Sequence, residues 1–103
     1  MKMLEKAIEQ SFLRKMKKAF PFLRVPKLTM LSQRSWPDRL IPIPNGGSIY
    51  IEFKREGEKP TPLQEDCHEY LRGLGQDVQV FDNAEAAYQY VRAKLLESHG
   101  SPK

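Results

Sequence analysis

The segment that most constrains the fold lies between residues 48 and 54 and reads SIYIEFK. Apolar and polar residues alternate along it, and this period of two is typical of a β-strand with two different faces. One face carries only isoleucine and phenylalanine, whereas the opposite face carries Glu52 and Lys54. The segment therefore predicts a strand that buries one face and presents an acid and a base on the other.

A hairpin is predicted around this strand. The turn residues Asn-Gly-Gly at 45–47 precede it, and an apolar run at 40–43 lies before the turn. Two such runs around an Asn-Gly turn are a strong hairpin signal. Pro42 cannot donate a backbone hydrogen bond, so the first arm is expected to be irregular or to lie at the sheet edge.

Before the hairpin, apolar residues recur every four positions and predict a helix over residues 3–20 that Pro21 ends. Residues 22–31 contain apolar and β-branched residues together with Pro26. They predict an extended segment or a short strand.

After the hairpin, Thr61-Pro62-Leu63-Gln64 predicts a helix start with a capping box, and glycines at 73 and 75 end that helix. A short strand is expected over 77–81, followed by a last helix that Asp82 or Asn83 caps. We therefore expect an α/β fold with a mixed central sheet of three to four strands, flanked by about three helices.

Length and composition indicate one domain in a reducing compartment. The chain has 103 residues, and we expect a single domain over 1–98 with a polar tail at 99–103. No apolar run approaches a membrane span, and nothing near Met1 predicts a signal peptide. Cys67 is the single cysteine, so no internal disulfide forms and a cytoplasmic location is expected, in a host cell if the chain is viral.

The basic residues are concentrated in the first part of the chain. Residues 1–40 carry ten Lys or Arg and three acids, a net charge of +7, whereas the remainder has a net charge of −3. Such a basic region is typical of a surface that binds a polyanion, although a solvated lysine-rich face has the same composition.

A cluster of charged residues is predicted at one end of the hairpin. If the hairpin pivots near Gly46, Asp38 faces Lys54 and lies diagonal to Glu52, at about 7–8 Å or less. Two carboxylates suit a hard cation such as Mg²⁺, and Lys54 can orient or deprotonate an attacking water or offset phosphate charge. The alternative is an exposed cross-strand ion pair without a catalytic role.

The order of these motifs resembles a known nuclease family. Trp36-Pro37-Asp38-Arg39, a glycine-bearing turn and Ile51-Glu52-Phe53-Lys54 resemble the Pro-Asp…(Asp/Glu)-x-Lys signature of a nuclease superfamily. Together with Thr-Pro-Leu-Gln at 61–64 and the Leu-Gly beyond it, the chain is similar to the virus-type replication-repair nuclease (VRR-NUC) domain over roughly residues 5–85. This resemblance implies a restriction-endonuclease-like core.

The resemblance also implies roles for individual residues. Asp38, Glu52 and the backbone carbonyl of Phe53 would be metal ligands, and Lys54 the catalytic lysine. The family uses a glutamate on the first helix, for which Glu9 fits better than Glu5, although either is within reach. Gln64 matches a family glutamine, and its capping role explains it equally well.

Further residues are assigned to DNA or to packing. Lys27 aligns with a basic position of the family, and Arg39 adjoins Asp38. The family often has Gly-x-Pro-Asp, whereas Ser35 stands at the glycine position here, which puts a close backbone approach to DNA in doubt. Trp36 is expected to pack rather than to stack on a base. The basic residues assigned to DNA binding are Lys17, Lys18, Lys27, Arg34 and Arg39.

The function expected is that of an Mg²⁺-dependent DNA endonuclease, with Mn²⁺ able to substitute. Branched DNA such as junctions or flaps is the substrate that the resemblance implies, in replication, recombination or repair. One small domain would cut two strands as a C₂ homodimer, which we therefore expect. The alternatives are an inactive nucleic-acid-binding module with a nuclease-like core, and a nuclease that cuts RNA or acts as a host-directed toxin.

Overall fold

A computed structural model describes residues 3–28, 35–44 and 46–100, with side chains up to residue 97 in the last helix. Three helices and three strands follow one another along the chain: α1 (Glu5–Ala19), β1 (Arg39–Ile43), β2 (Gly47–Phe53), α2 (Pro62–Gly73), β3 (Asp77–Phe81) and α3 (Ala84–Gly100). The expected elements are thus present, and α3 extends two residues into the segment predicted as a tail. None of the helices in the described ranges is long and apolar enough to cross a bilayer.

The strands form one mixed sheet in the order β1-β2-β3. β1 pairs with β2 in antiparallel orientation, and β2 pairs with β3 in parallel orientation. β1 is an edge strand with Pro42 exposed, as its missing donor requires. The predicted α/β class and mixed sheet are confirmed, with three strands.

The hairpin register differs from the prediction by two residues. Arg39 pairs with Ile51 and Ile43 with Gly47, so this register places Asp38 opposite Glu52 rather than opposite Lys54. The prediction assumed a pivot at Gly46, but Gly46 has φ 98° and ends a three-residue connection, an arrangement that needs glycine at its last position. The correction brings the two carboxylates closer together than the sequence suggested.

The segment before β1 continues this edge for a short distance. Lys27 forms an isolated antiparallel bridge with Arg39, because Leu40 N donates to Pro26 O (3.2 Å) and Leu28 N donates to Asp38 O (2.9 Å). The extended segment predicted after Pro21 is therefore confirmed at 26–28, and its residues 29–31 lie outside the described ranges.

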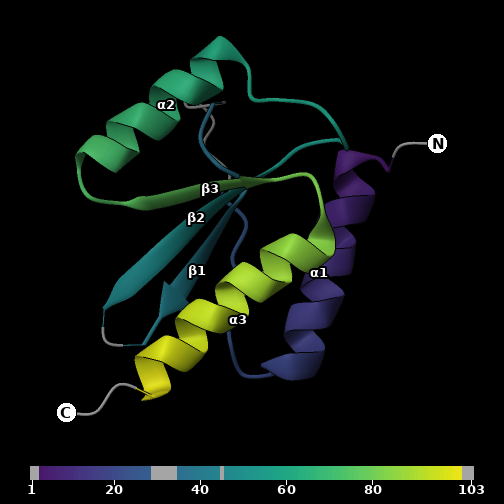
Figure 1. The fold of residues 1–103 in the computed structure, drawn as a ribbon, viewed down its shortest axis with the longest axis vertical. Helices are drawn as coiled ribbons and strands as arrows, with labels where there is room; N and C mark the ends of the chain where they lie inside the picture. The colour runs from purple at the N-terminus through teal and green to yellow at the C-terminus, as the bar shows by residue number, and fades with distance from the viewer. Residues whose placement is uncertain (1–2, 29–34, 45, 101–103) are drawn as a thin grey trace.

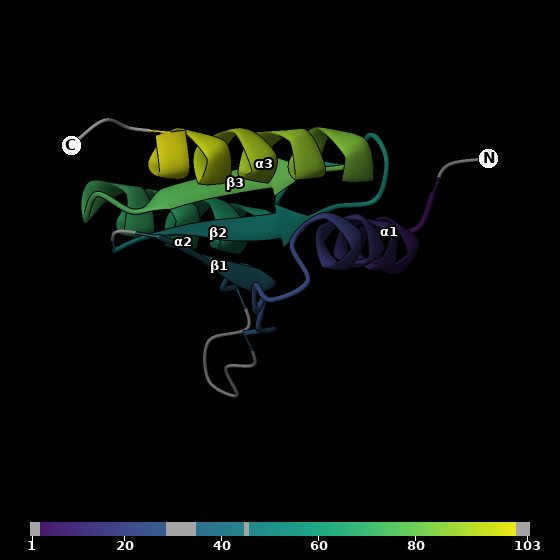
Figure 2. The same cartoon turned by 90° about the horizontal axis from the view of Figure 1, so that it is seen from below.

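The sheet separates two packed layers, with α1 and α3 on one face and α2 on the other (Figure 1). On the first face, Phe12, Ile51 and Val91 are fully buried within the larger core. On the second face, Cys67 and Leu71 of α2 pack on Val78 of β3. Figure 2 shows α3 along the sheet, with α1 beside the end towards which β2 points.

The local signals explain where the helices begin. Thr61 and Gln64 form the predicted capping box at the start of α2, and Pro62 occupies the first turn. Asn83 rather than Asp82 caps α3, since its Oδ1 accepts a hydrogen bond from Ala86 N at 2.8 Å. The carboxylate of Asp82 instead accepts from Gly57 N, which ties the β2–α2 loop to the end of β3.

Candidate metal centre and active site

Asp38 is fixed by three hydrogen bonds with the backbone of two segments, β2 and the extended residues before β1. Its N–H donates to Ile51 O (2.9 Å), its carbonyl accepts from Leu28 N (2.9 Å), and its carboxylate Oδ2 accepts from Phe53 N (2.8 Å). It lies one residue before β1, next to the buried Pro37. The position of this carboxylate is therefore determined by the sheet itself.

Glu52 and Lys54 follow on the face of β2 that the alternation predicts. Ile51 and Phe53 are fully buried in the larger core, whereas Glu52 points to the α2 side of the sheet. Lys54 lies just beyond β2, where its N–H donates to Phe81 O at 2.9 Å. Both are buried, with 2% of Glu52 and 8% of Lys54 exposed. This burial does not fit the alternative of an exposed ion pair.

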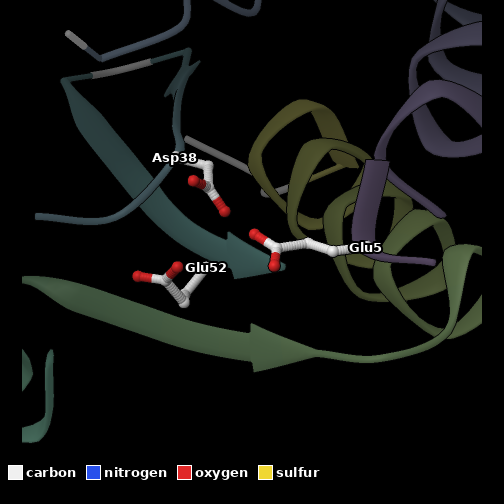
Figure 3. Close-up of side chains that lie close together, drawn as sticks. All are labelled: Glu5, Asp38 and Glu52. Carbon is white, nitrogen blue, oxygen red and sulfur yellow. The ribbon is translucent and has the colours of Figure 1, made fainter. Parts of the chain in front are cut away.

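A third carboxylate reaches this site from α1. Glu5, in the first turn of the helix, joins Asp38 and Glu52, and one carboxylate oxygen of each lies within 4.8 Å of the others. Figure 3 shows the Glu5 side chain extending from α1 towards the other two carboxylates. The structure thus gathers three acids from three separate parts of the chain.

Glu9, which the sequence favoured as the helix acid, does not lie in this group. Its Oε2 accepts from Arg39 Nε at 2.7 Å, and its Oε1 lies 3.9 Å from Lys27 Nζ. Arg39 also donates to Val25 O at 3.0 Å. The charge of Glu9 is therefore compensated one turn away from the carboxylate group, while Glu5 is left to face the other acids.

The three carboxyl groups perturb one another. Burial, followed by the charge of Asp38, raises the pKa of Glu52 to about 8. Burial also raises the pKa of Asp38, against the hydrogen bond from Phe53 N that lowers it. The pKa of Glu5 is raised by burial and then by the Asp38 charge. Burial and the repulsion among the acids thus outweigh the attraction of the Lys54 ammonium, which lowers the pKa of Glu5 and Glu52.

Gln64 connects the base and the acid of β2. Its Oε1 accepts from Lys54 Nζ (2.9 Å) and from Thr61 N (2.9 Å), while its Nε2 lies 3.4 Å from Glu52 Oε2. The capping role and the role beside Lys54, which the sequence left as alternatives, are present together. One amide holds the start of α2 and the Lys54 ammonium in fixed positions.

His68 also contacts Glu52, and the sequence did not predict this contact. The histidine is 1% exposed, and its Nε2 lies 3.5 Å from Glu52 Oε1. Burial lowers its pKa, which favours the neutral ring. Helical periodicity carried a signal for it, because residues four apart share a helix face and His68 follows Gln64 by four.

The predicted DNA-binding residues have different surroundings. Lys17 and Lys18 are exposed in the last turn of α1, about 18 Å along the helix from Glu5. Lys27 is exposed and lines a hollow of about 310 Å³ together with Glu5 and Asp38. Arg39 is mostly buried against Glu9, so its charge faces an acid. Arg34 lies outside the described residues.

Two further side chains pack on the α2 side of the sheet, and for Trp36 this is the role expected from the sequence. Trp36 packs edge-on against Tyr50, with ring centroids 6.4 Å apart, over the cluster around Leu71. Cys67 is buried in the same cluster.

The donor set fits a divalent cation. Three carboxylates offer hard oxygen ligands at a spacing that one ion can bridge, and Mg²⁺ and Ca²⁺ prefer such ligands. The raised pKa of Glu52 indicates that its negative charge is unfavourable in this position, and a bound cation would stabilise that charge. Within the described residues, Glu5, Asp38 and Glu52 are the group that could hold such an ion.

Known proteins resemble this chain in part of its sequence and in its fold. No family model matches the chain. A stretch of 57 residues is 46% identical to "Putative nuclease p44" of Acyrthosiphon pisum secondary endosymbiont phage 1, covering 55% of this chain and 61% of that protein. The chain thus spans about three fifths of the length of this curated relative.

The fold has a solved counterpart. A structure described as "VRR_NUC domain protein" superposes with a TM-score of 0.75 over 92% of this chain and 90% of that chain, at 18% sequence identity. At this identity the likeness concerns the architecture alone. The protein therefore has the fold of a VRR-NUC domain.

Proposed function

We propose that this protein is a metal-dependent nuclease that hydrolyses the phosphodiester bonds of DNA. The observation that carries the proposal is the group of Glu5, Asp38 and Glu52, with oxygens within 4.8 Å of one another. The VRR-NUC fold and a 46% identical stretch in a protein named as a nuclease support it. Branched or structured DNA, such as a junction or flap in replication, recombination or repair, is the substrate class we propose.

Asp38 and Glu52 would hold the metal, with Glu5 as the acid from α1 and the backbone carbonyl of Phe53 as a further ligand. Mg²⁺ is the ion proposed, and Mn²⁺ would substitute because it accepts the same oxygen ligands. When bound, such an ion stabilises negative charge on the phosphate and lowers the pKa of a coordinated water. Glu9 is not needed as a ligand, since Arg39 holds its carboxylate at 2.7 Å.

Lys54 would act on the reacting groups themselves. Its ammonium is held by Gln64 Oε1 at 2.9 Å and lies next to the strand position of Glu52. From there it can donate a hydrogen bond to a phosphate oxygen, or orient the attacking water. Gln64 keeps this ammonium in place before substrate arrives, which reduces the cost of ordering it during the reaction.

The exposed lysines of α1 and Lys27 would contact the DNA backbone. Lys17 and Lys18 lie at the far end of the helix that carries Glu5, so a bound strand could extend from the site along α1. Two copies related by a two-fold axis would present two sites to two strands, which is why we propose a homodimer.

The test is cleavage of labelled junction, flap, duplex DNA and RNA with Mg²⁺, Mn²⁺ or EDTA. We expect metal-dependent cutting of DNA, and Asp38→Asn should lower its rate at least about 100-fold, the loss typical of removing one group that stabilises transition-state charge. The matched control is Asp66→Asn, an exposed aspartate on α2, which should leave the rate unchanged.

Three outcomes would contradict the proposal. DNA binding without cutting under every metal would instead identify an inactive nucleic-acid-binding module. Cutting that persists in EDTA would exclude the metal. Preferential cutting of RNA would change the substrate class while leaving the proposed metal centre intact.

A further inference from the structure

His68 is a buried ionisable side chain that the proposed reaction does not use. It is 1% exposed and lies on the inner face of α2, one turn after Gln64. Its Nε2 lies 3.5 Å from Oε1 of Glu52, and the Nε2 of Gln64 lies 3.4 Å from Oε2 of the same carboxylate. Both oxygens of Glu52 are thus contacted by side chains of one helix.

The chemistry of the Glu52 carboxylate determines which group donates the hydrogen bond between Glu52 and His68. An ionised carboxylate can only accept hydrogen bonds, so His68 must carry its proton on Nε2 when Glu52 is charged. A neutral imidazole with this proton and the Gln64 amide then restrict the rotation of the carboxylate about its side chain. Hydrogen bonds to a ligand's second oxygen or nitrogen are what orient metal ligands in proteins.

Packing alone does not account for an imidazole at this position. The apolar contacts of α2 are made by Cys67 and Leu71 against Val78, and a leucine would fill similar space. A buried polar group costs free energy unless it has a hydrogen-bond partner, and the partner of His68 is Glu52. The polar edge of the His68 ring is therefore directed at that carboxylate.

We propose that His68 is a positioning residue that orients the Glu52 carboxylate for the divalent metal. The proposal rests on the metal-binding function proposed above and deepens it. Side chains of α2 contact both oxygens of Glu52. Asp38 and Glu5 reach the same point from the sheet edge and from α1. The α2 helix would then set the orientation of the Glu52 carboxylate towards the metal.

Three variants of the full chain separate orientation from packing. His68→Leu keeps the bulk and removes the donor, whereas His68→Gln restores an N–H at a similar reach. Leu71→Ala is the matched control, since Leu71 is buried on the same helix but belongs to the apolar cluster. The measurement is the Mn²⁺ dissociation constant, by titration with electron paramagnetic resonance detection, together with the melting temperature of each metal-free variant.

We expect His68→Leu to weaken Mn²⁺ binding about 10–100-fold, and His68→Gln to recover most of that loss. Leu71→Ala should lower the melting temperature and leave the Mn²⁺ affinity unchanged. In the metal-free wild-type protein well above pH 8, where the Glu52 carboxyl is ionised, long-range ¹H–¹⁵N NMR should find the His68 ring protonated on Nε2.

The outcomes distinguish this proposal from the proposed function. If wild-type protein binds Mn²⁺ and folded His68→Leu binds it equally well, the positioning role is overturned and the metal centre stands. A ring protonated on Nδ1 alone at a pH where Glu52 is ionised would also overturn it, even if His68→Leu failed to fold. If wild-type protein binds no Mn²⁺, the proposed function fails first and this role fails with it.

Discussion

The two faces of β2 are buried to a similar degree but are stabilised in different ways. On the α1 and α3 side, Ile51 and Phe53 are fully buried among apolar side chains. On the α2 side, Glu52 and Lys54 are also buried, at 2% and 8% exposed, but their contacts are hydrogen bonds to Gln64 and His68. Burial therefore does not distinguish the faces, whereas the nature of the partners does.

This difference separates a face that stabilises the fold from the face on which we propose the chemistry. Apolar burial contributes roughly 25 cal/mol for each Å² removed from water. Burying carboxylates beside one another costs free energy, which here is visible in the pKa of about 8 for Glu52. Such a cost is typical of functional sites, where the charged groups serve a ligand rather than the fold.

The largest expected effect is on the apolar face. Phe53→Ala should lower the free energy of unfolding by about 3–5 kcal/mol, because it opens a cavity where the ring packs 5.3 Å from that of Phe12. Glu52→Gln, one residue away on the other face, should cause no loss in metal-free protein, since it removes a charge that its neighbours repel. Urea unfolding of both variants at pH 8 is the measurement.

Comparable losses in the two variants would contradict the division between the faces. It would mean that Glu52 contributes to the folded state through its hydrogen bonds as much as Phe53 does through packing.

The apolar face was predictable from sequence because its signal is local. Alternation along 48–54 assigned the two isoleucines and the phenylalanine of β2 to the apolar core, where they lie. The four-residue spacing of Leu4, Ile8, Phe12 and Met16 identified three buried residues of α1, whereas Leu4, which precedes the helix, is exposed. The capping box at Thr61 is likewise predicted from residues that are close together in the sequence. Such patterns need no knowledge of the tertiary arrangement.

The polar face was predictable only in part, because it depends on distances between elements. The register was wrong by two residues, since the number of connecting residues in a hairpin cannot be read from Asn-Gly-Gly alone. The choice between Glu5 and Glu9 depended on how α1 docks on the sheet. The contact between His68 and Glu52 was not predicted, because the two residues are 16 positions apart in sequence.

The next effect in size concerns the two acids of α1, which test where the polar face ends. Glu5→Gln should weaken Mn²⁺ binding about 10-fold or more, because its carboxylate lies with Asp38 and Glu52. Glu9→Gln should leave the Mn²⁺ affinity nearly unchanged and instead lower the melting temperature, since Arg39 then remains buried and charged without its partner. Isothermal titration and thermal unfolding of both variants give the comparison.

The reverse result, with Glu9→Gln losing the metal and Glu5→Gln keeping it, would show that the ion pair with Arg39 opens when metal binds. The sequence-based choice of Glu9 would then be the correct one for the loaded protein.

The smallest effect is the pH dependence that the crowded carboxylates impose on stability. The pKa of Glu52 is raised from 4.5 to about 8 in the folded state, so its contribution to stability is fully present below pH 4.5 and is lost as pH rises through 8. Between pH 7 and 8, where unfolded histidine is mostly neutral, metal-free protein should lose at most about 1.4 kcal/mol, the limit for one proton per pH unit. Urea unfolding at both pH values should show this loss in the wild type and in Glu65→Gln, an exposed control on α2, but not in Glu52→Gln.

Saturating Mg²⁺ should remove the difference, because a bound cation compensates the charge that protonation otherwise neutralises. An equal slope in wild type and Glu52→Gln would mean that the buried acids of the polar face impose no such cost, and the contrast between the two faces of β2 would lose its electrostatic basis.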